Sequence, residues 1–355
     1  METTHRVEVG DARTLDLPAE SVELVVTSPP YPMVEMWDDL FTDLDPAVGA
    51  ALDEDAGDAA FEAMHEVLDA VWAEVARVLV EGGIACINVG DATRTLSRFR
   101  VYRNHARIAD AFEALGFDPL PDVLWRKPAN SAAKFMGSGM LPPSAYVTLE
   151  HEYVLVFRKG ERRSFEPGAT DRYEAAYFWE ERNRWFSDVW TDITGERQER
   201  RATDGQDGTA NGGRERTAAF PFEIPYRLIN MYSVYGDTVL DPFFGTGTTS
   251  LAAAVAARNS VGYELDEEFV TVFDERISET PALSRTVTRE RLENHRAFAR
   301  EQENAGTPLA YEAEHYDVPV RTKQERQIRL YTVDSVTDLE DETGYRAVHI
   351  PAELE

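Results

Sequence analysis

The amino-acid sequence predicts an α/β protein built on a doubly wound, mostly parallel sheet. Short apolar runs typical of buried strands alternate with amphipathic segments at helical spacing, the pattern of parallel strands joined by helices. The clearest unit, residues 239–264, reads as strand, glycine turn, alanine-rich helix and strand. A chain of 355 residues is long enough for roughly two domains.

The predicted strands are apolar runs bounded by glycine, proline or charged residues. They cover residues 22–27, 84–89, 123–126, 153–157, 239–241 and 261–264. The predicted helices carry apolar residues three or four positions apart and cover residues 61–78, 108–115 and 248–257. Glycines at 82–83 and at 116 are expected to end the first two helices.

Composition divides the chain into four segments. Residues 1–159 and 218–279 carry the strand–helix alternation, interrupted by a strongly acidic insertion at 37–60. Residues 160–217 are polar, rich in Arg, Glu, Trp and Tyr, and contain a Gly/Asp/Thr stretch that predicts a mobile loop. Residues 280–355 form an extension whose Arg/Glu mixture favours a solvated helix over 287–303, followed by strand-like runs at 327–333 and 345–350.

The net charge of −29 is the most unusual property of the composition, and only four of the basic residues are Lys. At molar salt the screening length falls to roughly 3 Å, so distant charges cease to interact. A solvated acidic surface suits a halophile's cytoplasm because net charge keeps a protein soluble. An ordinary acidic enzyme is the alternative, and neither interpretation excludes a nucleic-acid ligand.

Charge is also distributed unevenly. Residues 35–81 contain fourteen acids and one base, whereas residues 92–140 contain eight bases and four acids. No Asp or Glu occurs between residues 123 and 149. A surface with few acidic side chains is what binding of a polyanion requires. Chance clustering of residues would produce the same pattern.

Several kinds of protein are disfavoured by the sequence. No apolar run reaches ~18 residues, which predicts no membrane span. The N-terminus lacks the apolar core of a signal peptide, which predicts a cytoplasmic protein. The single cysteine, Cys86, excludes an internal disulfide and a cysteine metal cluster. The seven His show no metal-ligand spacing, so no metal is expected.

A glycine turn follows the predicted strand that ends at Asp241. Gly245 and Gly247 would let a ligand approach the backbone, and Glu264 ends the next strand, where an acid accepts hydrogen bonds from a ribose. A dinucleotide fingerprint requires glycine where Ser250 stands, and Asp241 suits an ammonium group better than a pyrophosphate. The combination indicates S-adenosylmethionine, with a purely structural turn as the alternative.

A second motif, Thr27-Ser28-Pro29-Pro30-Tyr31, follows the first predicted strand. Two prolines fix the backbone and remove two N–H donors, which leaves carbonyls and the Ser28 hydroxyl facing a pocket. This arrangement can hold a planar base that stacks on Tyr31 while its exocyclic amine donates to Ser28 and to the Pro29 carbonyl. A proline-stiffened turn around a buried tyrosine is the alternative.

Together the two motifs resemble the amino-methyltransferases of DNA. The catalytic motif precedes the cofactor motif, as in the permuted β group of that family. Further segments that resemble the family occur in the expected order at 10–11, 88–91, 125–128, 151–153 and 220–229. The resemblance covers about half of the chain. It implies a Rossmann-like fold with a catalytic half at 1–159, a target-recognition region at 160–217, and a cofactor-binding half at 218–279, leaving 280–355 without an assigned role.

The resemblance also implies roles for individual residues. The catalytic residues would be Ser28, Pro29, Pro30 and Tyr31. S-adenosylmethionine, which leaves as S-adenosylhomocysteine, would contact Asp11, Phe220, Asp241, Phe243, Gly245, Gly247, Thr248 and Glu264. Duplex DNA would contact Arg94, Arg98, Arg100, Arg103, Lys127, Lys134, Arg162, Arg163, Arg200 and Arg201. A cognate restriction endonuclease remains open as a partner.

The identity of the first motif residue suggests the target base. Ser28 resembles the N4-cytosine members, whereas N6-adenine members more often carry Asp or Asn there. The implied reaction is methylation of cytosine N4 after the base leaves the duplex, with adenine N6 as the alternative. Methylation at cytosine C5 would require a cysteine nucleophile, and Cys86 lies within an apolar run.

Three further alternatives remain. An RNA or protein methyltransferase is disfavoured by the motif order, and an inactive nucleic-acid-binding regulator by the intact motif residues. An NAD oxidoreductase is disfavoured by Ser250.

Overall fold

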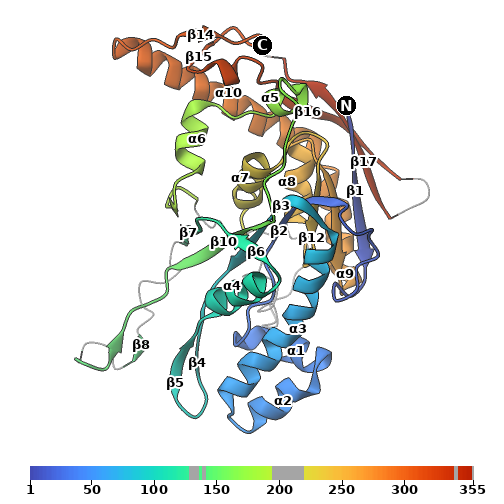
Figure 1. Cartoon of the computed structure of the whole chain (residues 1–355), viewed down its shortest axis with the longest axis vertical. Coiled ribbons are helices and arrows are strands. Elements are labelled where there is room, and N and C mark those ends of the chain that lie inside the picture. The colour runs from blue at the N-terminus through green and yellow to red at the C-terminus, as the bar shows by residue number, and fades with distance from the viewer. Residues whose placement is uncertain (128–135, 138–140, 194–219, 340–342, 354–355) are drawn as a thin grey trace, which may run out of the picture.

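One large sheet organises the molecule (Figure 1). The computed structural model describes residues 1–127, 136–137, 141–193, 220–339 and 343–353. Within these residues, eleven strands form the sheet in the order β11-β7-β10-β3-β2-β12-β13-β1-β17-β16, with β6 beside β10. Its five central strands are mutually parallel. They are β3 (Leu79–Val89), β2 (Val22–Thr27), β12 (Thr238–Asp241), β13 (Asn259–Glu264) and β1 (Glu2–Val9). The predicted fold class is confirmed.

Antiparallel strands extend this parallel centre on both sides. Beyond β3 come β10 (His151–Lys159), β6 (Phe117–Pro119), β7 (Val123–Arg126) and β11 (Val189–Trp190), of which β11 is parallel to β7. Beyond β1 come β17 (Gly344–Pro351) and β16 (Tyr331–Asp338). The C-terminal extension therefore contributes two strands to the main sheet.

Helices bury both faces of the sheet. On β2, Val25 contributes to the core on one face, and Leu24 and Val26 contribute to the core on the other. The first face is covered by α3 (Gly57–Val78) and α4 (Asn104–Ala114), the second by α7 (Glu223–Tyr232) and α8 (Thr248–Val255). Burial of both faces explains why β2 and the second half of β3 are nearly continuous apolar runs, whereas β1 alternates buried and more exposed residues.

Glycines 82 and 83 do not end α3, contrary to the prediction. The helix ends at Val78, and Leu79 already belongs to β3. Gly82 has φ +76°, and a Cβ there would collide with the backbone of Arg163. Gly82 is therefore required because the backbone at Arg163 passes too close to this point of β3 for any side chain to fit. Gly116, with φ +87°, follows α4 as predicted.

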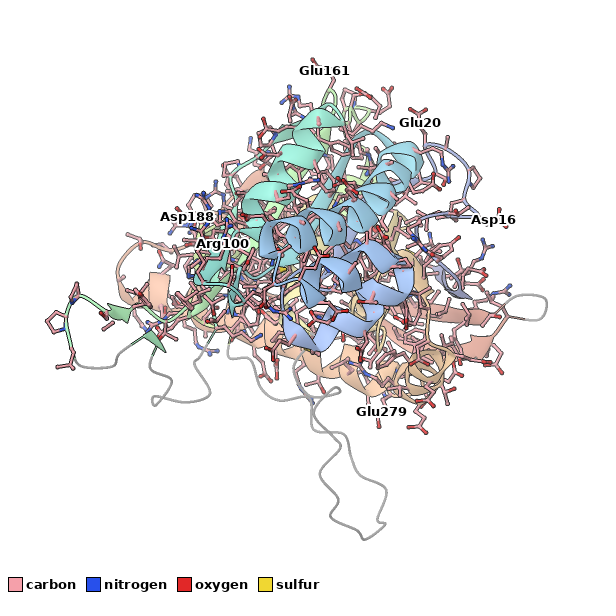
Figure 2. All side chains as sticks on the ribbon, turned by 90° about the horizontal axis from the view of Figure 1, so that it is seen from below. Asp16, Glu20, Arg100, Glu161, Asp188 and Glu279 are labelled. Carbon is pink, nitrogen blue, oxygen red and sulfur yellow. The ribbon has the colours of Figure 1, made fainter. Side chains whose placement is uncertain are left out.

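The acidic insertion folds into short helices at one end of the molecule (Figure 1). These are η1 (Glu35–Trp37), α1 (Asp38–Leu44) and α2 (Pro46–Asp53). Phe41 and Val48 are fully buried against α3, which anchors the insertion to the core. Elsewhere, acidic side chains such as Asp16, Glu20, Glu161 and Glu279 point outward from the rim of the molecule (Figure 2).

The extension begins with α10 (Thr280–Asn304), which packs on β16 and α8. The expectation of a solvated helix is wrong for one face, because Thr288, Leu292 and His295 are buried. The predicted strand at 327–333 is also displaced, since β16 begins at Tyr331. The preceding Ile328 and Leu330 fill a small apolar cluster beside α10 instead.

Hydrogen bonds join the two ends of the chain. Besides the β1–β17 pairing, the Met1 ammonium donates to the carbonyl of His349 at 3.2 Å. Thr3 Oγ1 lies 3.0 Å from His5 Nε2 and 2.8 Å from His349 Nε2. Burial lowers the pKa of His5 to about 3 and that of His349 to about 4. Both imidazoles are therefore neutral at neutral pH.

The remaining elements are short, apart from α9, which packs beside β1 and β13. They are β4 (Ala92–Thr95), β5 (Phe99–Tyr102), β8 (Met136–Gly137), β9 (Ala145–Tyr146), α5 (Thr170–Glu174), α6 (Trp179–Trp185), α9 (Glu267–Ile277), β14 (Tyr311–Glu312), β15 (Pro319–Val320) and η2 (Lys323–Glu325). Over the described part of the chain, no helix has the length and apolar character needed to cross a membrane.

Candidate active site

Both predicted motifs lie at one edge of the sheet, where the central parallel strands have their carboxyl ends. The Ser28 loop follows β2, and the glycine turn follows β12, the neighbouring strand. Thr27 Oγ1 donates a hydrogen bond of 2.6 Å to Asp241 Oδ1, across 214 positions of sequence. The topology thus places the Ser28 loop directly beside the glycine turn, at the usual ligand position in open α/β sheets.

Asp241 is a buried carboxylate, only 3 % exposed. Burial raises its pKa to about 6, although hydrogen bonds from Thr27, Thr249 and the Phe243 amide act in the opposite direction. The Phe243 amide lies 3.1 Å from Oδ1. A buried carboxylate that is costly to ionise is stabilised by a cationic ligand, as an ammonium group would provide.

Glu264 fixes the backbone of three neighbouring residues at the end of β13. Its Oε2 accepts from the Gly245 amide at 2.7 Å, and its Oε1 accepts from the amides of Leu265 and Asp266 at 3.0 and 3.1 Å. Burial raises the pKa of Glu264. The carbonyl of Glu264 also accepts from the Gly10 amide at 2.8 Å. Besides the predicted ribose contact, this carboxylate therefore shapes the glycine turn.

The two glycines of the turn face different surroundings. Both have positive φ, +54° at Gly245 and +75° at Gly247. A Cβ on Gly245 would meet no atom closer than 4.0 Å, whereas one on Gly247 would collide with the rings of Phe273 and Phe244. Gly245 therefore leaves room for a ligand, and Gly247 permits close packing of α9. Open space at Gly245 beside Asp241 and Glu264 fits S-adenosylmethionine.

This difference predicts different phenotypes for two alanine variants. Gly247→Ala is expected to lower the free energy of unfolding by about 2 kcal/mol, because it adds overpacking to backbone strain. Gly245→Ala has strain alone and is expected to cost about 1 kcal/mol, with a larger loss in cofactor affinity. Urea unfolding and titration with S-adenosylmethionine measure the two effects. Equal destabilisation of both variants would contradict the assignment of Gly247 to packing.

The other predicted cofactor residues make ion-pair, hydrogen-bond or packing contacts within the protein. Burial acts to raise the pKa of Asp11, but the Arg13 guanidinium, 2.6 Å away, brings it below its usual value. Thr248 Oγ1 accepts from Arg276 at 3.2 Å. Phe220 is buried against α7. Phe243 packs edge-on against Trp72 with ring centres 5.8 Å apart.

A hydrogen-bond network reaches the catalytic loop from β3 and β10. Tyr31 Oη lies 3.1 Å from Ser28 Oγ and donates to Glu152 Oε2 at 3.0 Å. Asn88 Nδ2 donates to Tyr31 Oη at 2.9 Å and to Glu152 Oε2 at 2.8 Å. Lys127 Nζ donates to Glu152 Oε1 at 2.8 Å. Burial and the Glu152 charge raise the pKa of Tyr31 well above its usual range. Asn88 and Glu152 lie in the family-like segments 88–91 and 151–153, but neither is among the predicted site residues.

The two prolines of the catalytic loop are buried. Asn104, the first residue of α4, links the loop to the end of β3. Its Nδ2 donates to the Pro32 carbonyl at 3.1 Å and to the Gly90 carbonyl at 2.9 Å. A Cβ on Gly90 would lie 3.1 Å from the Tyr31 ring. Glycine at this position therefore lets the ring approach the end of β3, and the Asn104 hydrogen bond constrains the loop at Pro32.

The predicted DNA-binding residues occupy different environments. Arg94 and Arg100 pair with Asp38 and Asp58 of the acidic segment. Arg163 pairs with Asp237, which precedes β12 and so lies at the opposite edge of the sheet from the two motifs. Lys127 belongs to the catalytic network. The exposed members are Arg98, Arg103 and Arg162. Lys134, Arg200, Arg201 and the predicted loop at 203–213 lie outside the described residues.

Cys86 is fully buried in β3 and contributes to the core that α7 and α8 cover. Burial raises the pKa of its thiol, which disfavours the reactive thiolate. In the part of the chain that the structure describes, no three His, Cys, Asp or Glu side chains gather into a group able to hold a metal ion.

The chain is similar in sequence to known DNA methylases. A family model described as DNA methylase, N6/N4 type, matches residues 22–275. The chain is 49 % identical to the type II methyltransferase M.MthZI of Methanothermobacter thermautotrophicus, over 98 % of this chain and 97 % of that protein. It is 50 % identical to the type II methyltransferase M.MjaI of Methanocaldococcus jannaschii, over 78 % and 91 %.

Solved structures show the same fold. TTHA0409 of Thermus thermophilus, a candidate DNA modification methylase complexed with S-adenosyl-L-methionine, is 34 % identical with a TM-score of 0.59, over 78 % of this chain and 93 % of that chain. The cytosine-N4-specific PvuII DNA methyltransferase is similar in fold, with 17 % identity and a TM-score of 0.50 over 77 % of this chain and 86 % of that chain.

Proposed function

Since this chain belongs to the N6/N4 DNA methylase family, whose cofactor is S-adenosylmethionine, we propose that it methylates the exocyclic N4 amine of cytosine at specific sites in duplex DNA. The observation that carries the proposal is the junction of the two motifs. The Thr27–Asp241 hydrogen bond of 2.6 Å brings the base-binding loop beside the cofactor turn. A target amine held by the loop would therefore lie next to the donated methyl group.

When bound, S-adenosylmethionine supplies the methyl group and leaves as S-adenosylhomocysteine. The residues of this chain perform binding and alignment. Asp241 would pair with the ammonium group, Gly245 would leave room for the ligand, and Glu264 would accept from the ribose. The Ser28 hydroxyl and the Pro29 carbonyl would accept hydrogen bonds from the two N–H groups of the target amine and direct its lone pair toward the methyl group. The nitrogen forms its bond to the methyl group as the sulfonium bond breaks, and one of its protons is then released to solvent. Alignment of this kind supplies much of the rate in a desolvated site.

The choice of cytosine over adenine rests on Ser28. Among the DNA amino-methyltransferases that the sequence resembles, serine at this position is typical of N4-cytosine members, whereas N6-adenine members more often have Asp or Asn. Methylation of adenine N6 is the second candidate, because the same acceptors would hold that amine. In either case the base must leave the duplex, at a cost of a few kcal/mol that stacking and phosphate contacts offset.

We assign a separate role to each of the three segments from residue 1 to residue 279. Residues 1–159 hold the target base and 218–279 hold the cofactor, whereas 160–217 would read the DNA sequence. Arg98 and Arg103, exposed near the β4–β5 hairpin, are the described residues best placed for phosphate contacts. The acidic surface and scarcity of Lys support a halophilic setting, in which DNA binding takes place at multimolar KCl.

The reaction is tested by incubating the protein with S-adenosylmethionine and unmethylated duplex DNA in multimolar KCl. Nucleosides from the digested DNA are then identified by mass spectrometry. N4-methylcytosine is expected with the wild type, and its yield should fall at least 100-fold in Ser28→Ala, because removing one fixed hydrogen-bonding partner of a transition state costs about 10²–10³ in rate. Asp16→Asn, a change at the rim, is expected to retain full activity (Figure 2).

The other products distinguish the alternatives. N6-methyladenine would retain the mechanism and refute the interpretation of Ser28. Absence of any methylated DNA base despite measurable cofactor binding would favour an RNA or protein substrate, which parallel reactions with those substrates would reveal.

A further inference from the structure

We infer that Glu152, acting through Tyr31, fixes the direction of the Ser28 hydroxyl and so makes the catalytic loop selective for a hydrogen-bond donor. Glu152 is then a positioning residue that favours an amine over a carbonyl on the target base. The inference rests on the proposed function, because it concerns how the same loop recognises its target.

The donors and acceptors of the network can be assigned from its chemistry. A carboxylate accepts only, so the Tyr31 hydroxyl must donate to Glu152 Oε2. Tyr31 has one proton, so it must accept in its 3.1 Å contact with Ser28 Oγ. The Ser28 hydroxyl is therefore the donor in that contact. Asn88 Nδ2 donates to the remaining lone pair of Tyr31, which leaves this hydroxyl fully occupied.

Burial and charge hold this arrangement in place. Glu152 and Asn88 are 8 % and 2 % exposed, so water competes little for their hydrogen bonds. Lys127 Nζ donates to Glu152 Oε1 at 2.8 Å and stabilises its charge. Glu152 thus accepts from three side chains, Tyr31, Asn88 and Lys127. A protonated or amide side chain at this position could not accept from all three.

The consequence is that the Ser28 side chain, Pro29 and Pro30 offer acceptors to a target base but no donor. Pro29 and Pro30 lack N–H groups, and the Ser28 proton is committed to Tyr31. An exocyclic amine would find the Ser28 lone pairs and the Pro29 carbonyl as partners. A carbonyl at the same ring position would place oxygen against oxygen, and sites built for a donor reject such analogues strongly.

The first test compares wild type, Glu152→Gln and Tyr31→Phe in steady-state methylation of plasmid DNA with radiolabelled S-adenosylmethionine. Both variants are expected to lose at least tenfold in kcat, with the dissociation constant for S-adenosylmethionine unchanged. Glu150→Gln, two positions away on the exposed surface, is the matched control and should retain wild-type kcat. In the double variant the loss should equal that of Tyr31→Phe alone, since both changes interrupt one chain.

The second test measures selectivity directly, using duplexes in which uracil replaces the mapped target cytosine. Wild type is expected to bind the cytosine duplex at least tenfold more tightly, and this ratio should approach one in Tyr31→Phe and in Glu152→Gln. A purely structural role would leave the ratio unchanged. Tyr31→Phe keeps the ring and tests the inference even if Glu152→Gln fails to fold.

The inference is overturned if Glu152→Gln keeps wild-type kcat, if the two losses multiply in the double variant, or if the cytosine-to-uracil ratio stays constant. Failure of the proposed function is distinguishable, because then the wild type itself would leave cytosine N4 unmethylated.

Discussion

Replacing Glu181 by alanine is expected to lower the free energy of unfolding by about 3–5 kcal/mol, the usual cost of leaving one member of a buried ion pair without its partner. Arg291 Nε lies 2.6 Å from Glu181 Oε1, and Nη2 lies 2.8 Å from Oε2. The side chains are 11 % and 5 % exposed. The pair joins α6 to α10, so the variant should loosen the C-terminal extension. Urea unfolding at constant KCl, followed by tryptophan fluorescence, measures the effect.

A double variant separates pairing from packing. Glu181→Leu combined with Arg291→Met removes both charges and should recover most of the lost stability. Recovery would be incomplete by about 1 kcal/mol, because the Phe178 amide also donates to Glu181 Oε2. Glu301→Ala, an exposed change on α10, should stay within about 0.5 kcal/mol of wild type. A cost below 1 kcal/mol for Glu181→Ala would show that the buried pair is not coupled to folding.

Asp241→Asn is expected to weaken S-adenosylmethionine binding about 10- to 100-fold at pH 7, because it would remove the charge-assisted hydrogen bond that we propose Asp241 makes to the ammonium group. The wild-type affinity should fall about tenfold per pH unit below about 6, where Asp241 becomes protonated. The affinity of Asp241→Asn should not follow this slope. Calorimetric titration between pH 5 and pH 7 tests both statements, with Asp16→Asn as the control.

Stability should change in the opposite direction in the same variant. Burial raises the pKa of Asp241 from 3.8 to about 6, so the folded state binds this proton more tightly than the unfolded chain does. The group therefore costs stability increasingly as pH rises from about 4 to about 6. Above pH 6, the unliganded Asp241→Asn protein should be more stable than wild type. A variant that is both less stable and unimpaired in binding would refute the ammonium-binding role.

Periodicity predicted the helices well where one face is buried by neighbouring layers. The helix predicted over 61–78 is α3, and the strand predicted over 22–27 is β2. Boundaries set by distant contacts could not be predicted. Gly82 looks like a helix stop because its contact with the backbone of Arg163 is invisible in local sequence. The position of β17 in the main sheet likewise depends on residues about 340 positions earlier.

The candidate site was predictable to the extent that its residues lie in contiguous motifs. The topology brings the two motifs together as expected. The family-like segments at 88–91 and 151–153 contain Asn88 and Glu152, but local sequence did not predict that these side chains would hydrogen-bond to Tyr31 from other strands. Local charge also could not predict the partner of Arg94, because Asp38 belongs to the acidic insertion 56 positions earlier.

The contact between residue 1 and residue 349 has a consequence for the evolution of this architecture. Because these residues are hydrogen-bonded neighbours, the chain describes an almost closed loop through the sheet (Figure 1). Joining such ends and opening the loop at another surface connection would leave every strand in place. The arrangement of the Ser28 loop and the glycine turn in space is therefore separable from their order along the chain.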